Sequence, residues 1–168
     1  MKKVKEFQTY LQESSLSRLW SHNEEHDCGA MTAFRKAADC GEGVKYTKAD
    51  NIKRNKSLLA KIKSKGYGAT TLKGIYPEGG QTTKEISYFI VDLEDGGTLE
   101  KDLKKLGNEF EQDSILYIPK GAIQNTAKAY LIGTNSCKDN WLGLGKKEVF
   151  NKGKMAYSSP VYTSYVNG

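Results

Sequence analysis

Residues 85–118 read EISYFIVDLEDGGTLEKDLKKLGNEFEQDSILYI, and this stretch decides the fold class. Its first eight residues favour a β-strand and carry apolar groups on both alternating faces, which is typical of a strand covered on both sides. A turn of acids and glycines follows, and Thr98 then opens a run with leucines at helical spacing. A second β-favouring run, 114–118, stops at Pro119. The stretch therefore predicts strand, helix and strand joined by short links.

Similar elements lie on either side of this stretch. The spacing predicts a helix over 48–65 that starts at a capping box of Thr47 and Asp50 and ends at Gly66. One strand is predicted at 67–75, between this helix and the central stretch, and another at 128–132, after the central stretch. Links this short do not allow parallel crossovers between neighbouring strands. We therefore predict an α+β fold with a mainly antiparallel sheet of four to five strands and helices packed on it.

The two ends of the chain are less regular than its middle. Residues 1–43 are predicted to form a helical N-terminal segment or arm, in which 27–43 fits either a strand or a helix. Residues 44–135 form the α+β core, and residues 136–168 form a C-terminal hairpin or tail packed on that core. A chain of 168 residues suits a single domain overall.

Composition is that of a folded chain, with 38% hydrophobic and 27% charged residues. No apolar run approaches membrane-spanning length, and the N-terminus lacks the apolar centre of a signal peptide. We therefore expect a soluble protein that is neither secreted nor membrane-bound. The three cysteines are an odd number, and because nothing suggests export, reduced thiols are the default, with a bond between Cys28 and Cys40 disfavoured.

The net charge of +6 is unevenly distributed. Residues 45–65 hold eight basic side chains and one acid, whereas residues 92–113 hold eight acids and three lysines. One interpretation is two solvated helix faces of opposite sign, packed side by side. The other is a basic surface for nucleic acid or a phosphorylated ligand, flanked by Tyr46 and Tyr67 for base stacking. Its candidate ligand-binding residues are Lys53, Arg54, Asn55 and Lys56.

Acidic and hydroxyl side chains at the turns suggest a second hypothesis, a metal-assisted hydrolase. A hairpin would bring Glu78 near Glu85, and paired carboxylates bind divalent metals or do acid–base chemistry. Ser87 shares a strand face with Glu85, and Asp113 could complete the set. The alternative is that these are solvated turn and edge residues.

Short polar side chains also follow the ends of the predicted strands. Gln112 precedes one strand, and Thr134 and Asn135 follow another. Such groups can receive a ligand's phosphate or amide, or they can form turns and caps.

The sequence predicts no firm metal site and leaves any cofactor open. The weak candidates for ligands have zinc-binding side chains, but their spacing is not that of a familiar zinc finger. They are His22, His26, Cys28 and Cys40.

Several phrases of the sequence occur together in one group of viral proteins. They are HDCG at 26–29, TAFR at 32–35, RNKSL at 54–58, KGYG at 65–68, YPE at 76–78, FEQDS at 110–114 and LIGTN at 131–135. The set resembles small uncharacterised proteins of tailed bacteriophages, including crAss-like phages of gut bacteria. The resemblance implies a viral origin and a location in the host cytoplasm or the virion, and it brings no activity with it. It adds a third hypothesis, a virion component or an inhibitor of a host protein.

Among the three functions, binding of nucleic acid or a phosphorylated ligand through the basic helix is the one we favour from the sequence. Protein–protein contacts as a virion component or host inhibitor come second, and a metal-assisted hydrolase comes third.

Overall fold

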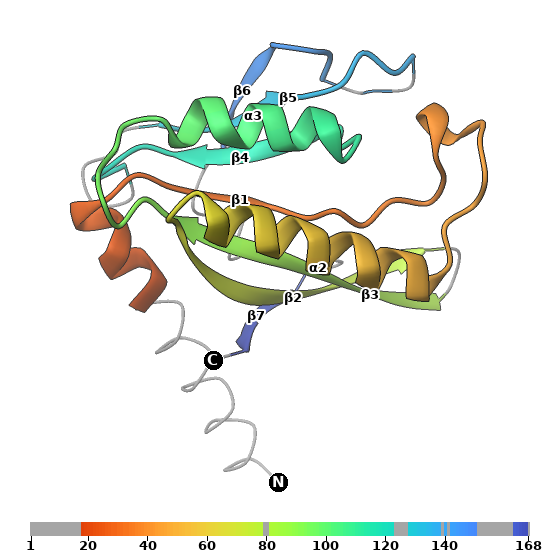
Figure 1. Cartoon of the computed structure of the whole chain (residues 1–168), viewed down its shortest axis with the longest axis horizontal. Coiled ribbons are helices and arrows are strands. Elements are labelled where there is room, and N and C mark those ends of the chain that lie inside the picture. Colours follow the sequence, from red (N-terminus) through yellow and green to blue (C-terminus); the bar gives the residue numbers. More distant parts are fainter. Residues whose placement is uncertain are drawn as a thin grey trace, which may run out of the picture.

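The computed structural model describes residues 18–78, 81–122, 128–138, 140, 142–150 and 163–167, with side chains described except at 74–84, 150 and 163–167. Seven strands form one sheet in the order β6-β5-β4-β1-β3-β2-β7 (Figure 1). Every neighbouring pair is antiparallel. The strands are β1 Cys28–Met31, β2 Gly68–Glu78, β3 Gln81–Val91, β4 Ser114–Ile118, β5 Ala129–Gly133, β6 Lys147–Phe150 and β7 Thr163–Asn167.

The predicted α+β class and the antiparallel sheet are confirmed, but the sheet has more strands than the four to five expected. The additional strands β1, β6 and β7 come from the segments predicted as an arm and a tail. β1 lies between β3 and β4, near the middle of the sheet. The boundaries proposed after residues 43 and 135 stay predictions.

Helices α2 (Lys48–Ser64) and α3 (Leu99–Glu109) cover one face of the sheet (Figure 1). α2 packs on β2 and β3, whereas α3 packs on β1 and β4. The expected capping box of Thr47 and Asp50 starts α2, and Gly66 follows it with a positive φ of 87°. The apolar faces of both helices and the even-numbered residues of β3 form one buried cluster between the two layers.

A second buried cluster fills the other face of the sheet. Its largest member is Phe89, which contacts the edge of the Trp20 ring with ring centroids 6.0 Å apart. Trp20 and the buried Leu19 belong to a helical stretch over 18–25. The rest of the predicted N-terminal helices falls on residues 1–17, outside the described residues. Within the described chain, no helix is long and apolar enough to cross a membrane.

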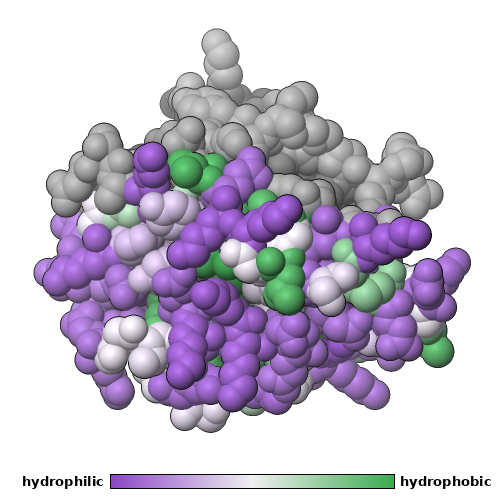
Figure 2. Space-filling model, turned by 90° about the horizontal axis from the view of Figure 1, so that it is seen from above, coloured by the Kyte–Doolittle hydropathy of each residue, from purple (hydrophilic) through white to green (hydrophobic). Residues whose placement is uncertain are grey.

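The outer surface in Figure 2 is mostly hydrophilic, and its hydrophobic residues form small separate spots. Large exposed hydrophobic side chains among the described residues come from different elements: Val44, Ile52, Leu93, Leu144 and Val149. The burial pattern thus places the apolar groups of the described chain mainly in the two clusters on either side of the sheet.

One stability prediction arises from the close packing of α3. Gly107 lies inside this helix, where alanine normally stabilises a protein by about 1 kcal/mol. A Cβ atom at Gly107 would lie 2.7 Å from Thr134 Cγ2 and 2.8 Å from Ile115 Cγ2. Overpacking of this kind costs about 1–3 kcal/mol. After the gain from helix propensity is subtracted from this cost, we expect Gly107→Ala to lower the free energy of unfolding by about 1 kcal/mol in urea denaturation. Gly96→Ala, which meets nothing within 4 Å, is the matched control. A stabilised Gly107→Ala variant would show that the helix and β5 separate easily.

Candidate functional site

A cleft of about 430 Å³ opens at the end of the sheet where β1 stops and β4 begins. Its volume lies within the range of small-molecule sites, about 300–1,000 Å³. The lining combines cationic, anionic, amide and aromatic side chains. We call this site the Asp113 cleft; it is lined by Thr32, Phe34, Arg35, Lys36, Ala37, Gly41, Gln112, Asp113 and Ser114.

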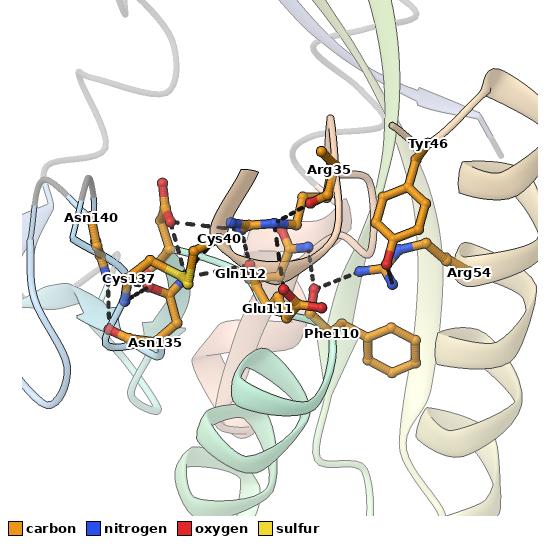
Figure 3. A network of polar contacts seen from close by, with 12 residues as sticks. Arg35, Cys40, Tyr46, Arg54, Phe110, Glu111, Gln112, Asn135, Cys137 and Asn140 are labelled. Carbon is orange, nitrogen blue, oxygen red and sulfur yellow. Dashed lines mark hydrogen bonds and ion pairs between the residues drawn. A yellow bond between two sulfur atoms is a disulfide. The ribbon is translucent and has the colours of Figure 1, made fainter. Parts of the chain in front are cut away.

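One wall of the cleft is the turn 110–113 between α3 and β4. Glu111 has a positive φ of 55°, so the chain turns sharply after the helix and presents its carbonyl groups to other segments. Arg54 Nη2 donates to the Phe110 carbonyl over 2.7 Å, and Arg35 Nη1 donates to the Glu111 carbonyl. The turn is thus held by guanidinium groups from two distant parts of the sequence (Figure 3).

The segment after β5 holds the same turn from another side. The Thr134 hydroxyl donates to the Gln112 carbonyl, and the Thr134 backbone N–H donates to the Asp113 carbonyl over 3.1 Å. Asn135 Nδ2 donates to Asp113 Oδ1 over 3.0 Å and to the Glu111 carbonyl over 3.3 Å. Both Thr134 and Asn135 are buried. The orientation of the Asp113 carboxylate is therefore set by a buried amide.

A disulfide bond between Cys40 and Cys137 joins the loop after β1 to the segment after β5 (Figure 3). This corrects our expectation of reduced thiols, since the Cα atoms of the two residues lie 5.3 Å apart. Cys137 N–H donates to Asn135 Oδ1 over 2.9 Å. The disulfide therefore also holds in place Asn135, the residue that orients Asp113.

Cys28 is the free cysteine; burial raises the pKa of its thiol to about 12, which keeps it protonated and unreactive.

Arg35 lies at the centre of these contacts, between the disulfide and the cluster around Arg54 (Figure 3). Its Nε donates to the Ala37 carbonyl over 2.9 Å. Its guanidinium lies 3.9 Å from a carboxylate oxygen of Glu111 and 3.9 Å from one of Asp113. The Arg35 side chain is 15% exposed, whereas that of Asp113 is 43% exposed. Arg35 is thus occupied by protein acceptors, and Asp113 keeps an open side toward the cleft.

The basic helix differs from our prediction of an outward-facing charged surface. Arg54 turns inward, where it lies over the Tyr46 ring at 4.4 Å from the centroid and donates to the Ala33 carbonyl over 2.9 Å. Asn55 is buried; its Oδ1 accepts the Ala33 N–H over 2.8 Å.

Among the lysines of this helix, Lys53 and Lys56 are exposed. Lys61 pairs with Glu109 and Lys65 with Asp102, so acids of α3 partly neutralise the lysines, as the interpretation of two adjacent helix faces expected.

The strand-borne acids lie apart from the Asp113 cleft. Glu85 and Ser87 sit on the β3 face that carries Phe89, opposite the face that packs on α2 and α3, and neither lines the cleft. The Glu78 backbone pairs with Gln81 at the β2–β3 turn, but the Glu78 side chain lies outside the described residues. β1 and β4 separate β3 from β5, so Glu85 does not join Thr134 and Asn135 in this cleft.

The weak metal candidates are not assembled into one site. Cys40 is bonded to Cys137, and Cys28 is buried in the sheet. His26 Nδ1 lies 2.8 Å from an Asp95 carboxylate oxygen, and His22 is exposed on the stretch 18–25. Within the described ranges no three His, Cys, Asp or Glu side chains are grouped to hold a metal ion.

The model of the S-adenosylmethionine lyase family matches residues 29–167, which include every residue lining the Asp113 cleft. The chain belongs to the S-adenosylmethionine lyase family. Among solved structures it is similar to a phage S-adenosylmethionine lyase in complex with S-methyl-5′-thioadenosine. The identity is 18%, the match covers 76% of this chain and 90% of that chain, and the TM-score is 0.30. No curated relative matches the chain.

Membership of the S-adenosylmethionine lyase family corrects the predicted function. Binding of nucleic acid or a phosphorylated ligand through the basic helix is wrong, and the inward turn of Arg54 is the structural reason that a count of charges misled us. The same match replaces the metal-assisted hydrolase and the virion component or host inhibitor. The narrower resemblance to crAss-like phages and the choice between host cytoplasm and virion stay predictions.

Sequence reasoning had singled out some of the residues at the Asp113 cleft and had passed over others. Gln112, Asp113, Thr134 and Asn135 were predicted as site residues, and the structure brings all four together. Phe34, Arg35 and Lys36 also line the cleft but were not among the candidates, because they follow β1 in a stretch without periodic pattern. Three adjacent residues that combine an aromatic ring with two cations were the available signal.

Proposed function

We propose that this protein cleaves S-adenosylmethionine in the Asp113 cleft. The observation that carries the proposal is the family match, because it spans the whole cleft. The lining also suits the ligand: S-adenosylmethionine presents a sulfonium, an ammonium, a carboxylate and an adenosine, and the cleft offers groups of both charges beside an aromatic ring.

The charges on the substrate suggest a role for Asp113. In a cleavage that needs no second reactant, an oxygen of the substrate's own carboxylate attacks Cγ while the bond between Cγ and sulfur breaks. The electron pair of that bond stays on sulfur, and the products are S-methyl-5′-thioadenosine and the lactone of the amino acid part. The positive charge on sulfur is therefore lost in the transition state. A carboxylate beside the sulfonium would stabilise the substrate more than the transition state, which slows the reaction. We therefore assign the Asp113 carboxylate to the ammonium group, whose charge does not change.

Two neighbours of Asp113 fit the other parts of the ligand. Lys36 lines the cleft and is exposed, so its ammonium can orient the substrate carboxylate by binding the oxygen that does not attack Cγ. Phe34 is partly exposed in the same lining, and its ring offers an apolar surface for adenine. Arg35, occupied by the turn 110–113, fixes the position of Asp113.

The proposal predicts a loss of activity in Asp113→Asn. This change keeps the size of the side chain and an oxygen for Asn135, but it removes the charge that faces the ammonium. We expect kcat/KM for S-adenosylmethionine to fall by about 100-fold, since bonds to charged groups contribute about 1.5–3 kcal/mol. Release of S-methyl-5′-thioadenosine, followed by chromatography and mass spectrometry, measures the rate.

The matched control is Asp95→Asn, an exposed aspartate that follows β3 at the opposite end of the sheet. We expect its kcat/KM to stay within about twofold of the wild type. Calorimetric titration with S-adenosylmethionine and S-methyl-5′-thioadenosine tests binding separately. A wild-type protein that neither binds nor cleaves S-adenosylmethionine would refute the proposed function.

A further inference from the structure

The wall of the Asp113 cleft opposite the turn 110–113 is an extended segment, residues 33–35, that follows β1. Its backbone groups on one side bond to side chains of α2. Asn51 Oδ1 accepts the Arg35 N–H over 2.9 Å, and Asn51 Nδ2 donates to the Arg35 carbonyl over 3.0 Å. Asn55 Oδ1 accepts the Ala33 N–H over 2.8 Å. A single amide thus makes with Arg35 the two bonds that a residue of a neighbouring antiparallel strand would make.

The rise per residue of a helix and that of an extended chain explain how this pairing extends over two positions. Four residues of an α-helix advance about 6.0 Å, and two residues of a strand advance about 6.6 Å. Asn51 and Asn55 are four residues apart, and Arg35 and Ala33 are two apart. The two amides therefore meet the two residues in register. Arg54, between them, donates its Nε to the Ala33 carbonyl over 2.9 Å.

The opposite edge of the same segment bonds to other partners. Gln112 Nε2 donates to the Phe34 carbonyl over 3.2 Å, and the Phe34 N–H donates to Thr32 Oγ1 over 3.1 Å. The alternation of partners between 33, 34 and 35 is that of a β-strand. Because side chains take the place of a neighbouring strand, the segment is ordered while the space beside it remains open as the cleft.

We propose that Asn51 is a positioning residue of the Asp113 cleft. Together with Arg54 and Asn55 it serves as a substitute for a neighbouring strand and sets where Phe34 and Arg35 stand. The identity of the ligand rests on the proposed function; the positioning itself does not. Since the Arg35 guanidinium contacts the turn 110–113, a shift of its backbone moves both walls of the cleft.

The experiment compares Asn51→Ala with Asn51→Asp and with Ser57→Ala, an exposed residue of the same helix. Asn51→Ala removes both bonds to Arg35. We expect KM for S-adenosylmethionine to rise about tenfold while kcat changes less than about threefold. Asn51→Asp keeps an acceptor for the Arg35 N–H, so its KM should lie between those of the wild type and Asn51→Ala. The KM of Ser57→Ala should match that of the wild type. A purely structural role would instead lower the fraction of active molecules, which reduces apparent kcat and leaves KM unchanged.

Hydrogen exchange of backbone amides, followed by NMR, gives a readout independent of activity. We expect exchange at the Arg35 amide to accelerate about tenfold in Asn51→Ala, to stay near the wild-type rate in Asn51→Asp, and to remain unchanged for amides of β3 in both. Unchanged exchange at Arg35, or an unchanged KM, in Asn51→Ala would overturn the proposal. If the wild type shows no activity toward S-adenosylmethionine, the proposed function fails and the exchange rates alone decide whether Asn51 positions the segment.

Discussion

Replacing Cys40 by serine is expected to lower the free energy of unfolding by about 3–5 kcal/mol. The bond between Cys40 and Cys137 joins positions 97 residues apart. In the chain-entropy account, cross-linking a loop of about 100 residues stabilises the native state by about 4.7 kcal/mol, because the unfolded chain loses freedom. Cys40 is exposed, so little packing is lost with it. The effect should therefore come mainly from the unfolded state.

Urea unfolding distinguishes this cause from local damage. Cys40→Ser, Cys137→Ser and the reduced wild type should unfold at the same urea concentration, and the double variant should show no further loss. Cys28→Ala is the control, because it removes the free buried thiol and leaves the disulfide in place. It should keep the difference between oxidised and reduced protein. Equal midpoints for oxidised and reduced wild type would mean that the bond adds nothing to stability.

The fold was predictable where local patterns are strong. β3, α3 and β4 follow from alternation and helical spacing, and the cap of α2 follows from Thr47 and Asp50. β1 was not predictable, because four residues are too few to show a period. Its central position depends on tertiary contact: a Cβ at Gly29 would clash with Leu103 Cδ1, so α3 packs directly on this strand. Such a requirement has no signature in a local window.

The site was predictable where polar residues stand at strand ends. Asp113 and Asn135 were identified that way, and they touch because β4 and β5 are paired. The contacts of Arg35 join residues up to 102 positions apart, and no local spacing encodes them. Asn55 was recognisable as an amide on the packed side of α2 that needed a partner. Asn51, four residues earlier, completes the pair, which was the missed signal.

The second large effect is expected at Arg54. Arg54→Ala should lower the free energy of unfolding by about 3–4 kcal/mol, because it removes a donor from the carbonyls of two buried residues, Ala33 and Phe110. Gln112 still donates to the Phe110 carbonyl, so the larger cost falls on Ala33. The guanidinium also lies over the Tyr46 ring at 4.4 Å from the centroid, and contacts of this type contribute about 0.5–2 kcal/mol.

Arg54→Lys tests whether geometry or charge matters. Lysine keeps the positive charge but cannot donate along the three directions that the guanidinium uses, so we expect about half of the loss seen in Arg54→Ala. A lysine as stable as the wild type would show that charge alone suffices at this position.

Neighbouring basic residues of the same helix provide the decisive comparison. Lys53 and Lys56 are exposed, so Lys53→Ala and Lys56→Ala should each change stability by less than about 0.5 kcal/mol in the same urea experiment. If Arg54→Ala were as mild as these two, its side chain would be an ordinary surface cation. A large loss at Arg54 alone means that the basic helix carries one structural cation among solvated ones. The positive charge of Arg54 then serves to hold the cleft wall, and the charge of α2 does not indicate which ligand the protein binds.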